Sequence, residues 1–172
     1  MTRPILLLMM ILSTPALALS VGQAAPLVIF EETNGKKVTL PQSRVTLIFY
    51  EDKDAGPQNQ RTRDVVGPIT DMKENKPLLN FMAVADLEKW NWFPAKNFAL
   101  KEMAKIEKKE DCTLYADWRG IVRKSWKLTK ARSGIILLDT QGVVRFFGEG
   151  PLKPEQTNEL VKQLGALGLK TQ

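Results

Sequence analysis

The spacing of hydrophobic and polar residues changes several times along the chain, and each change predicts a different element. Nearly continuous runs of β-branched and aromatic residues are typical of strands buried on both faces. Apolar residues three or four positions apart are typical of helices, and Asn34-Gly35 and residues 140–142 are typical of hairpin turns. The predicted strands are 27–32, 36–40, 44–50, 78–85, 112–116, 134–139 and 143–147, and the predicted helices are 58–75, 97–109 and one opened by Pro154.

The alternation of strands and helices predicts an α/β fold with a layered sheet. Gly67-Pro68 is expected to kink or interrupt the first helix. The apolar residues expected on one side of each helix are Val65, Val66, Ile69 and Met72 in the first and Ala99, Met103 and Ile106 in the second. Those expected in central, largely buried strands are Leu47, Phe49, Phe81, Ala83, Ile136 and Leu138.

The amino end has the three parts of a secretory signal peptide. Thr2-Arg3 is a short positive segment, and residues 4–12 form an apolar run shorter than the roughly 20 residues that span a bilayer. Small residues follow at the spacing that signal peptidase recognises, at Ala16-x-Ala18, Ala18-x-Ser20 and Gly22-x-Ala24. We expect a signal peptide over 1–24, cleaved somewhere in 18–25, and one domain over 25–172. The domain would be periplasmic or secreted, with no transmembrane anchor after processing; the alternative is a short buried helix or an uncleaved anchor.

The residue types that the chain lacks exclude several kinds of site. It contains no histidine, which rules out Ser-His-Asp and Cys-His catalytic sites and His-ligated metals. Its one cysteine, Cys112, allows neither an intramolecular disulfide nor a CxxC pair. The net charge of +6 falls to about +5 without Arg3, and basic and acidic residues are interspersed, so we expect no nucleic-acid partner. Asp52-x-Asp54-x-Gly56 lacks the later acids of a calcium loop, and we expect neither a metal nor a cofactor.

The segments RVTLIFYEDK, LLNFMAVADL, CTLYADWRGIVRKSWKL and SGIILLDTQGVVRFFGEGPL follow one another along the chain. In this order they resemble a thioredoxin-like domain of the peroxiredoxin or redoxin type, whose Asp-x-x-Gly hairpin is similar to 138–144 here. The nearest named family is the exported YtfJ-like family. The resemblance implies an α/β, thioredoxin-like three-layer domain with a mixed central sheet and helices on both faces. The positions similar to the carboxyl half of that family are Trp126, Leu128, Leu138, Asp139, Gly142, Val144, Gly150, Leu152 and Glu155.

The sequence departs from redox-active thioredoxins at the place where their chemistry lies. In those proteins a CxxC pair follows the first core strand, at the amino end of a helix whose dipole lowers the thiol pKa. The matching stretch here, EDKDAGPQ from Glu51 to Gln58, contains no sulfur. The cis-proline that normally precedes the hairpin strand of these proteins is also missing, because its position corresponds to about Ser133. We therefore interpret the chain as an exported thioredoxin-fold protein without a redox dithiol. It would be a non-catalytic binding or envelope-associated protein with an unknown protein or small-molecule partner.

Cys112 leaves a second function open, that of a single-cysteine, peroxiredoxin-like thiol enzyme. A lone cysteine on a strand is usually a small buried hydrophobic residue. The other interpretations are an exposed thiol that links two chains, or a catalytic thiolate near Lys108 and Lys109. Because the chain has no histidine to activate the thiol, we expect no catalytic residue.

Ligands of open α/β sheets bind where the carboxyl ends of parallel strands meet. In this chain that edge is expected to gather acidic residues and a loop rich in aromatic residues. The aromatic loop either folds onto the sheet edge or forms a patch that binds a protein or an apolar ligand. The candidate ligand- or partner-binding residues are Asp52, Asp54, Asp86, Trp90, Trp92, Phe93, Asp117 and Arg132.

Overall fold

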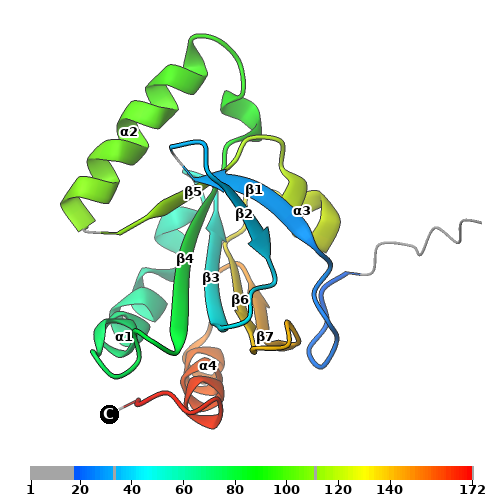
Figure 1. Ribbon diagram of the computed structural model, residues 1–172, viewed down its shortest axis with the longest axis vertical. Coiled ribbons are helices and arrows are strands. Elements are labelled where there is room, and N and C mark those ends of the chain that lie inside the picture. Colours follow the sequence, from blue (N-terminus) through cyan, green and yellow to red (C-terminus); the bar gives the residue numbers. More distant parts are fainter. Residues whose placement is uncertain (1–17, 33, 111, 172) are drawn as a thin grey trace, which may run out of the picture.

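The computed structural model describes residues 18–32, 34–110 and 112–171, in which strands and helices alternate (Figure 1). The strands are β1 (Val28–Glu32), β2 (Lys37–Leu40), β3 (Val45–Glu51), β4 (Leu79–Asp86), β5 (Leu114–Asp117), β6 (Gly134–Leu138) and β7 (Val144–Glu149). The helices are α1 (Gln60–Asp71), α2 (Ala95–Glu110), α3 (Ile121–Trp126) and α4 (Pro154–Ala166), with short 3-10 turns η1 (Gly56–Asn59) and η2 (Glu88–Trp90).

These strands form one mixed sheet in the order β2-β1-β5-β4-β3-β6-β7. β3, β4 and β5 are parallel, so their carboxyl ends share one edge of the sheet. β6 is antiparallel to β3, and β7 to β6. Both predicted hairpins are confirmed: β1 pairs antiparallel with β2, and Gly142 turns the chain before β7 with a φ of 77°. The Asp139 carboxylate holds that turn by accepting the N–H groups of Gln141 and Val143 at 2.8 and 2.9 Å.

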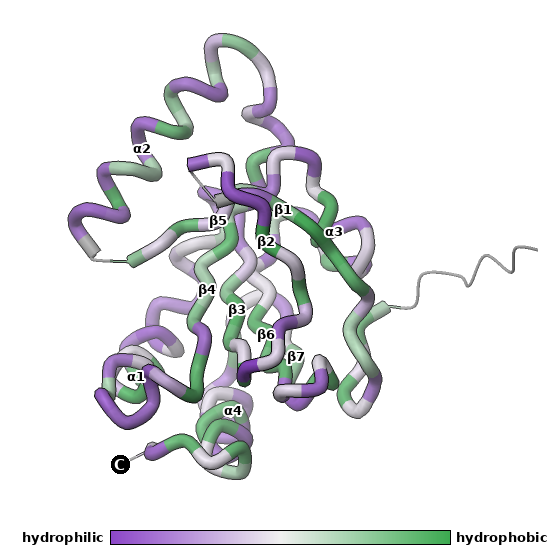
Figure 2. The backbone as a smooth tube through the Cα atoms, in the orientation of Figure 1, coloured by the Kyte–Doolittle hydropathy of each residue, from purple (hydrophilic) through white to green (hydrophobic). Residues whose placement is uncertain are grey.

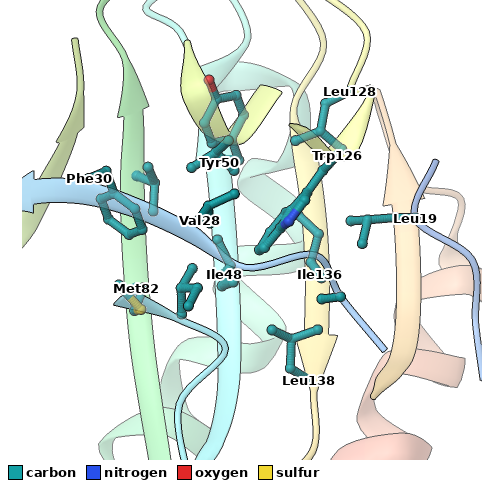
Figure 3. Close-up of a cluster of buried hydrophobic side chains, with 14 of the residues drawn as sticks. Leu19, Val28, Phe30, Ile48, Tyr50, Met82, Trp126, Leu128, Ile136 and Leu138 are labelled. Carbon is teal, nitrogen blue, oxygen red and sulfur yellow. The ribbon is translucent and has the colours of Figure 1, made fainter. Parts of the chain in front are cut away.

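The sheet buries apolar side chains on both faces, as the three-layer expectation requires. On one face α1 and α4 place Val66 and Leu160 in a cluster with Leu47. On the other face α3 and the β1–β2 hairpin close over a second cluster, in which Trp126 is fully buried beside Ile136 (Figure 3). Hydropathy follows this division, since the central strands are largely hydrophobic whereas α2 alternates along its length (Figure 2). The predicted burial of Leu47, Phe49, Ile136 and Leu138 is confirmed.

One expectation about strand burial is wrong, and the helix faces differ in exposure. Phe81 is expected inside a central, largely buried strand, but it is 37% exposed, with its ring centre 5.7 Å from that of Phe49. Val65 and Ile106 are 40% and 46% exposed, and Thr62 lies buried on the inner side of α1 instead. Of the two effects expected at Gly67-Pro68, an interruption is contradicted, because α1 continues past Pro68 to Asp71, and a kink stays a prediction.

The segment that precedes β1 packs onto the rest of the fold. Leu19 is 6% exposed and belongs to the cluster around Trp126 (Figure 3). The N–H of Gly22 donates to the carbonyl of Val144 at 2.8 Å, and the N–H of Ala25 donates to the carbonyl of Gly142 at 2.9 Å. This segment thus packs beside β7 through one antiparallel bridge, Ala24 with Val143. The expected signal segment lies mostly at 1–17, outside the described residues. No helix in the described ranges is long and apolar enough to cross a membrane.

Candidate functional site

The carboxyl end of β3 is held by a network of polar side chains around Glu51. The hydroxyl of Ser133 donates to one carboxylate oxygen of Glu51 at 2.5 Å, and the Arg63 guanidinium forms an ion pair with the other. Arg63 also donates to the carbonyl of Gly56 at 2.6 Å, and the side-chain oxygen of Gln58 accepts the N–H of Ser133 at 3.1 Å. These contacts therefore connect four parts of the chain: β3, the turn before α1, α1 itself and the segment before β6.

Burial governs the electrostatics of this network. The Glu51 side chain is only 13% exposed, and that burial raises its pKa, against the lowering effect of the Ser133 hydroxyl and the Arg63 charge. The Arg63 guanidinium is also 5.3 Å from the centre of the Phe49 ring. The residues at this corner are a carboxylate and, bonded to its two oxygens, a hydroxyl and a guanidinium, which can bind or orient groups but offer no thiol.

The predicted acidic residues at the neighbouring strand ends do come together, but most of them support the fold. Asp52, Asp54, Asp86 and Trp90 line one small pocket of about 20 Å³, which is room for about one water molecule. Asp52 accepts the N–H groups of Asp54 and Ala55 at 3.0 and 2.8 Å. Asp86 forms an ion pair with the Arg123 guanidinium at 2.8 Å. Glu88 forms a second ion pair with the same guanidinium. Within the described ranges no group of acidic or sulfur side chains is arranged to hold a metal ion.

Asp117, another predicted binding residue, is 1% exposed and faces three donors. The backbone N–H groups of Ile121 and Val122 donate to its two oxygens at 2.7 and 2.8 Å, and the Tyr50 hydroxyl donates at 3.1 Å. Burial raises the pKa of Asp117 and, with the neighbouring carboxylate, that of Tyr50. Asp117 therefore starts α3 and anchors Tyr50, and it is not available to a ligand.

The aromatic loop is divided between the fold and the surface. Trp90 is partly buried against α2, whereas Trp92 and Phe93 are 61% and 83% exposed. The indole N–H of Trp92 donates to the carbonyl of Lys89 at 3.1 Å, which fixes the ring outward. Arg132, the last predicted residue, is exposed and lies over Gly150, where an added Cβ would be 2.6 Å from its guanidinium.

Cys112 lies at the opposite end of the parallel strands, before β5. It is half-buried just before β5, and its N–H donates to the carbonyl of Glu107 at the end of α2. Because β5 runs parallel to β4 and β3, the amino end of β5 and the Glu51 network are at opposite ends of the strands. A helix carboxyl end carries partial negative charge, which disfavours a thiolate.

A cleft of about 460 Å³ was not predicted from the sequence. It lies between the β1–β2 hairpin, the turn after β5 and the start of α2. The residues that line it include Ile29, Lys37, Lys96, Trp118, Arg119 and Ile121. These residues are spread over more than 90 positions of sequence and meet only through the sheet order, so no local motif marks them.

Comparison with known proteins places this geometry in a wider group. Residues 96–167 match the model of a bacterial protein family of unknown function, YtfJ_HI0045. No curated protein matches the sequence. A candidate thiol:disulfide interchange protein, DsbE, of Chlorobium tepidum is similar in structure, with a TM-score of 0.65 and 20% identity over 87% of this chain and 99% of that one.

A second solved structure supports the same fold. The thioredoxin domain of a thiol-disulfide oxidoreductase of Bacteroides vulgatus is similar with a TM-score of 0.57 and 14% identity, over 86% of this chain and 99% of that one. At such identities the likeness shows the fold alone. The predicted thioredoxin-like fold class is confirmed, and so is the resemblance to the YtfJ family and to thioredoxin-like proteins.

Proposed function

We propose that this thioredoxin-fold chain is an exported binding protein that works without a redox dithiol, in solution or associated with the cell envelope. The observation that carries the proposal is the network of Glu51, Ser133 and Arg63. It fills the carboxyl end of β3, where the resemblance to thioredoxins places a dithiol and its proline. A corner at which Ser133 and Arg63 each bond to the Glu51 carboxylate lacks the sulfur that disulfide exchange needs.

The exposed aromatic residues supply a surface for partner binding. Trp92 and Phe93 lie on the loop before α2, and Phe98, in the first turns of that helix, is 60% exposed. Large aromatic side chains held outward in this way are enriched in protein interfaces, because they bury a large area at low cost in side-chain entropy. We assign the partner contact to Trp92 and Phe93.

The competing function is single-thiol chemistry at Cys112, and two thiol assays separate it from the proposal. The chain and its Cys112→Ser variant are mixed with dithiothreitol and either insulin, beside a CxxC thioredoxin as positive control, or hydrogen peroxide, whose reduction through a sulfenic acid needs only one cysteine. The proposal predicts that neither the wild type nor the variant accelerates insulin reduction or peroxide consumption above buffer. Acceleration of either reaction by the wild type that the variant lacks would establish the thiol enzyme instead.

Export belongs to the same proposal, and the packing of residues 19–25 supports one of the three cleavage sites. Cutting after Ser20 or Ala24 would remove Leu19, whose burial stabilises the fold by about 1.5–3 kcal/mol. Cutting after Ala18 keeps Leu19 and the hydrogen bonds of Gly22 and Ala25. We therefore assign cleavage to the bond between Ala18 and Leu19.

Intact-mass measurement of the mature protein from its native host tests this assignment. The expected mass is that of the chain from Leu19 to Gln172. A mature chain that begins at Val21 or Ala25 would contradict the cleavage site, and one that keeps Met1 would contradict export by a cleaved signal peptide.

A further inference from the structure

The 460 Å³ cleft has the size and chemistry of a small-molecule site. Pockets for small ligands usually enclose a few hundred Å³. Figure 1 shows the tip of the β1–β2 hairpin and the start of α2 at the same end of the sheet. Ile29, which is 47% exposed on β1, and Ile121 at the start of α3 supply apolar surface to the cleft.

The charged residues of the cleft are mainly cationic. Lys37, Lys96 and Arg119 line it together with the carboxylate of Glu31. The second carboxylate in the lining, Asp117, is buried and its oxygens already accept three hydrogen bonds.

The three cations remain available for a ligand. Among the residues that the structure describes, Lys37, Lys96 and Arg119 enter no ion pair. The Lys96 ammonium instead lies 4.6 Å from the centre of the Trp118 ring, which holds this charge at the cleft wall.

From this arrangement we infer that the cleft binds a small amphiphilic organic anion, with an apolar body against Ile29 and Ile121 and a carboxylate, sulfonate or phosphate at Lys96 and Arg119. The inference rests on the proposed binding function and gives it a ligand class and a site. It does not involve Trp92 and Phe93, so the partner surface and the ligand cleft are separable.

Two fluorescent probes of similar shape and different charge test the inference. Titration with 8-anilinonaphthalene-1-sulfonate is expected to show saturable binding, whereas the uncharged N-phenyl-1-naphthylamine should bind at least about tenfold more weakly, the loss expected when a charge-assisted contact is removed. Amide shifts in the 15N-labelled protein should be confined to residues lining the cleft, in the β1–β2 hairpin, the start of α2, and the turn after β5 with the start of α3. Equal binding of both probes, no binding, or shifts centred on Trp92 and Phe93 would overturn the inference.

Matched variants locate the charge. Arg119→Gln, at an exposed side chain, is expected to weaken sulfonate binding about tenfold, and Lys96→Gln to do the same. The control Arg61→Gln removes one exposed cation from α1 and should leave binding unchanged. Equal weakening by Arg61→Gln would show a general charge effect and overturn the site. Failure of these tests leaves the absence of dithiol chemistry untouched, since the insulin assay measures that separately.

Discussion

At the scale of single residues, Asp117 shows how a carboxylate that looks like a binding residue can belong to the fold. Its two oxygens accept from three donors, the backbone of Ile121 and Val122 and the Tyr50 hydroxyl. An asparagine in its place would offer one oxygen to these donors and turn an N–H group toward one of them.

We predict that Asp117→Asn lowers the free energy of unfolding by about 1–3 kcal/mol, the cost of leaving a buried polar group unsatisfied. Urea unfolding of the variant and the wild type measures this difference. Asp54→Asn, at a side chain that is 57% exposed, is the control and should cost less than about 0.5 kcal/mol. If both variants cost the same small amount, Asp117 does not hold α3 and Tyr50.

Glu51 gives a prediction for pH. Its pKa is raised by burial, so the folded state holds the proton more tightly than the unfolded state does. The free energy of unfolding should therefore fall as pH rises from the ordinary glutamate pKa of 4.5 to the raised pKa of the folded state, and Glu51→Gln should lack this fall. The stability difference, wild type minus variant, is expected to decrease with pH in urea unfolding. A difference that increases would mean that the Arg63 charge outweighs burial.

Asp139 provides a comparison of opposite sign. Burial works to raise its pKa, but the N–H groups of Val143 and Gln141 and the Arg145 guanidinium outweigh that effect and lower it. The stability that Asp139 gives is present above its unfolded pKa of 3.8 and is lost as pH falls through the folded value. The difference between wild type and Asp139→Asn should therefore increase with pH in the same experiment.

At the scale of elements, β3 and β4 carry two phenylalanines with different cover. Phe49 is 2% exposed, Phe81 is 37% exposed, and their ring centres are 5.7 Å apart. Phe49→Ala is expected to cost about 3–5 kcal/mol, the range for emptying a packed aromatic site, and Phe81→Ala less than half as much. Thermal or urea unfolding of the two variants measures both costs, and equal costs would show that α2 covers Phe81 in solution.

The same two strands show what a sequence can and cannot predict. Strand and hairpin positions follow from local spacing, and β3, β6 and the turn at Gly142 lie within a residue or two of their predicted bounds. Whether a side chain on β4 is buried depends on where α2 packs against the sheet. The spacing of apolar residues within β4 or α2 does not predict that position. Phe81 was therefore assigned to the core by its strand type alone.

The candidate site divides in the same way. The topological rule for parallel strands correctly brings Asp52, Asp54, Asp86 and Trp90 to one edge. The rule does not predict which carboxylates already accept hydrogen bonds from backbone N–H groups or pair with Arg123, because it considers only the strand ends. The cleft was missed for a related reason, since Lys37 and Lys96 become neighbours only through the pairing of β1 with β5.

At the scale of the whole molecule, the strands place Cys112 apart from the Glu51 network and the aromatic loop. The Glu51 network lies at the carboxyl end of β3 and the exposed aromatic loop follows the carboxyl end of β4, whereas Cys112 lies at the amino end of β5. A thiol mechanism would have to act through Cys112 alone, at the opposite end of the strands from the place where thioredoxins carry their dithiol. We propose instead that the protein functions by binding and that Cys112 contributes to packing.

The most direct test is partner capture from the exported fraction of the native host, with the wild type, Cys112→Ser and the double variant Trp92→Ser, Phe93→Ser as baits. Melting curves of all three baits establish that each is folded. The account predicts that Cys112→Ser retains the partner captured by the wild type, and that the double variant loses it while keeping its melting temperature. Loss of the partner by a folded Cys112→Ser bait, with capture retained by the double variant, would contradict the account and make the thiol the functional group.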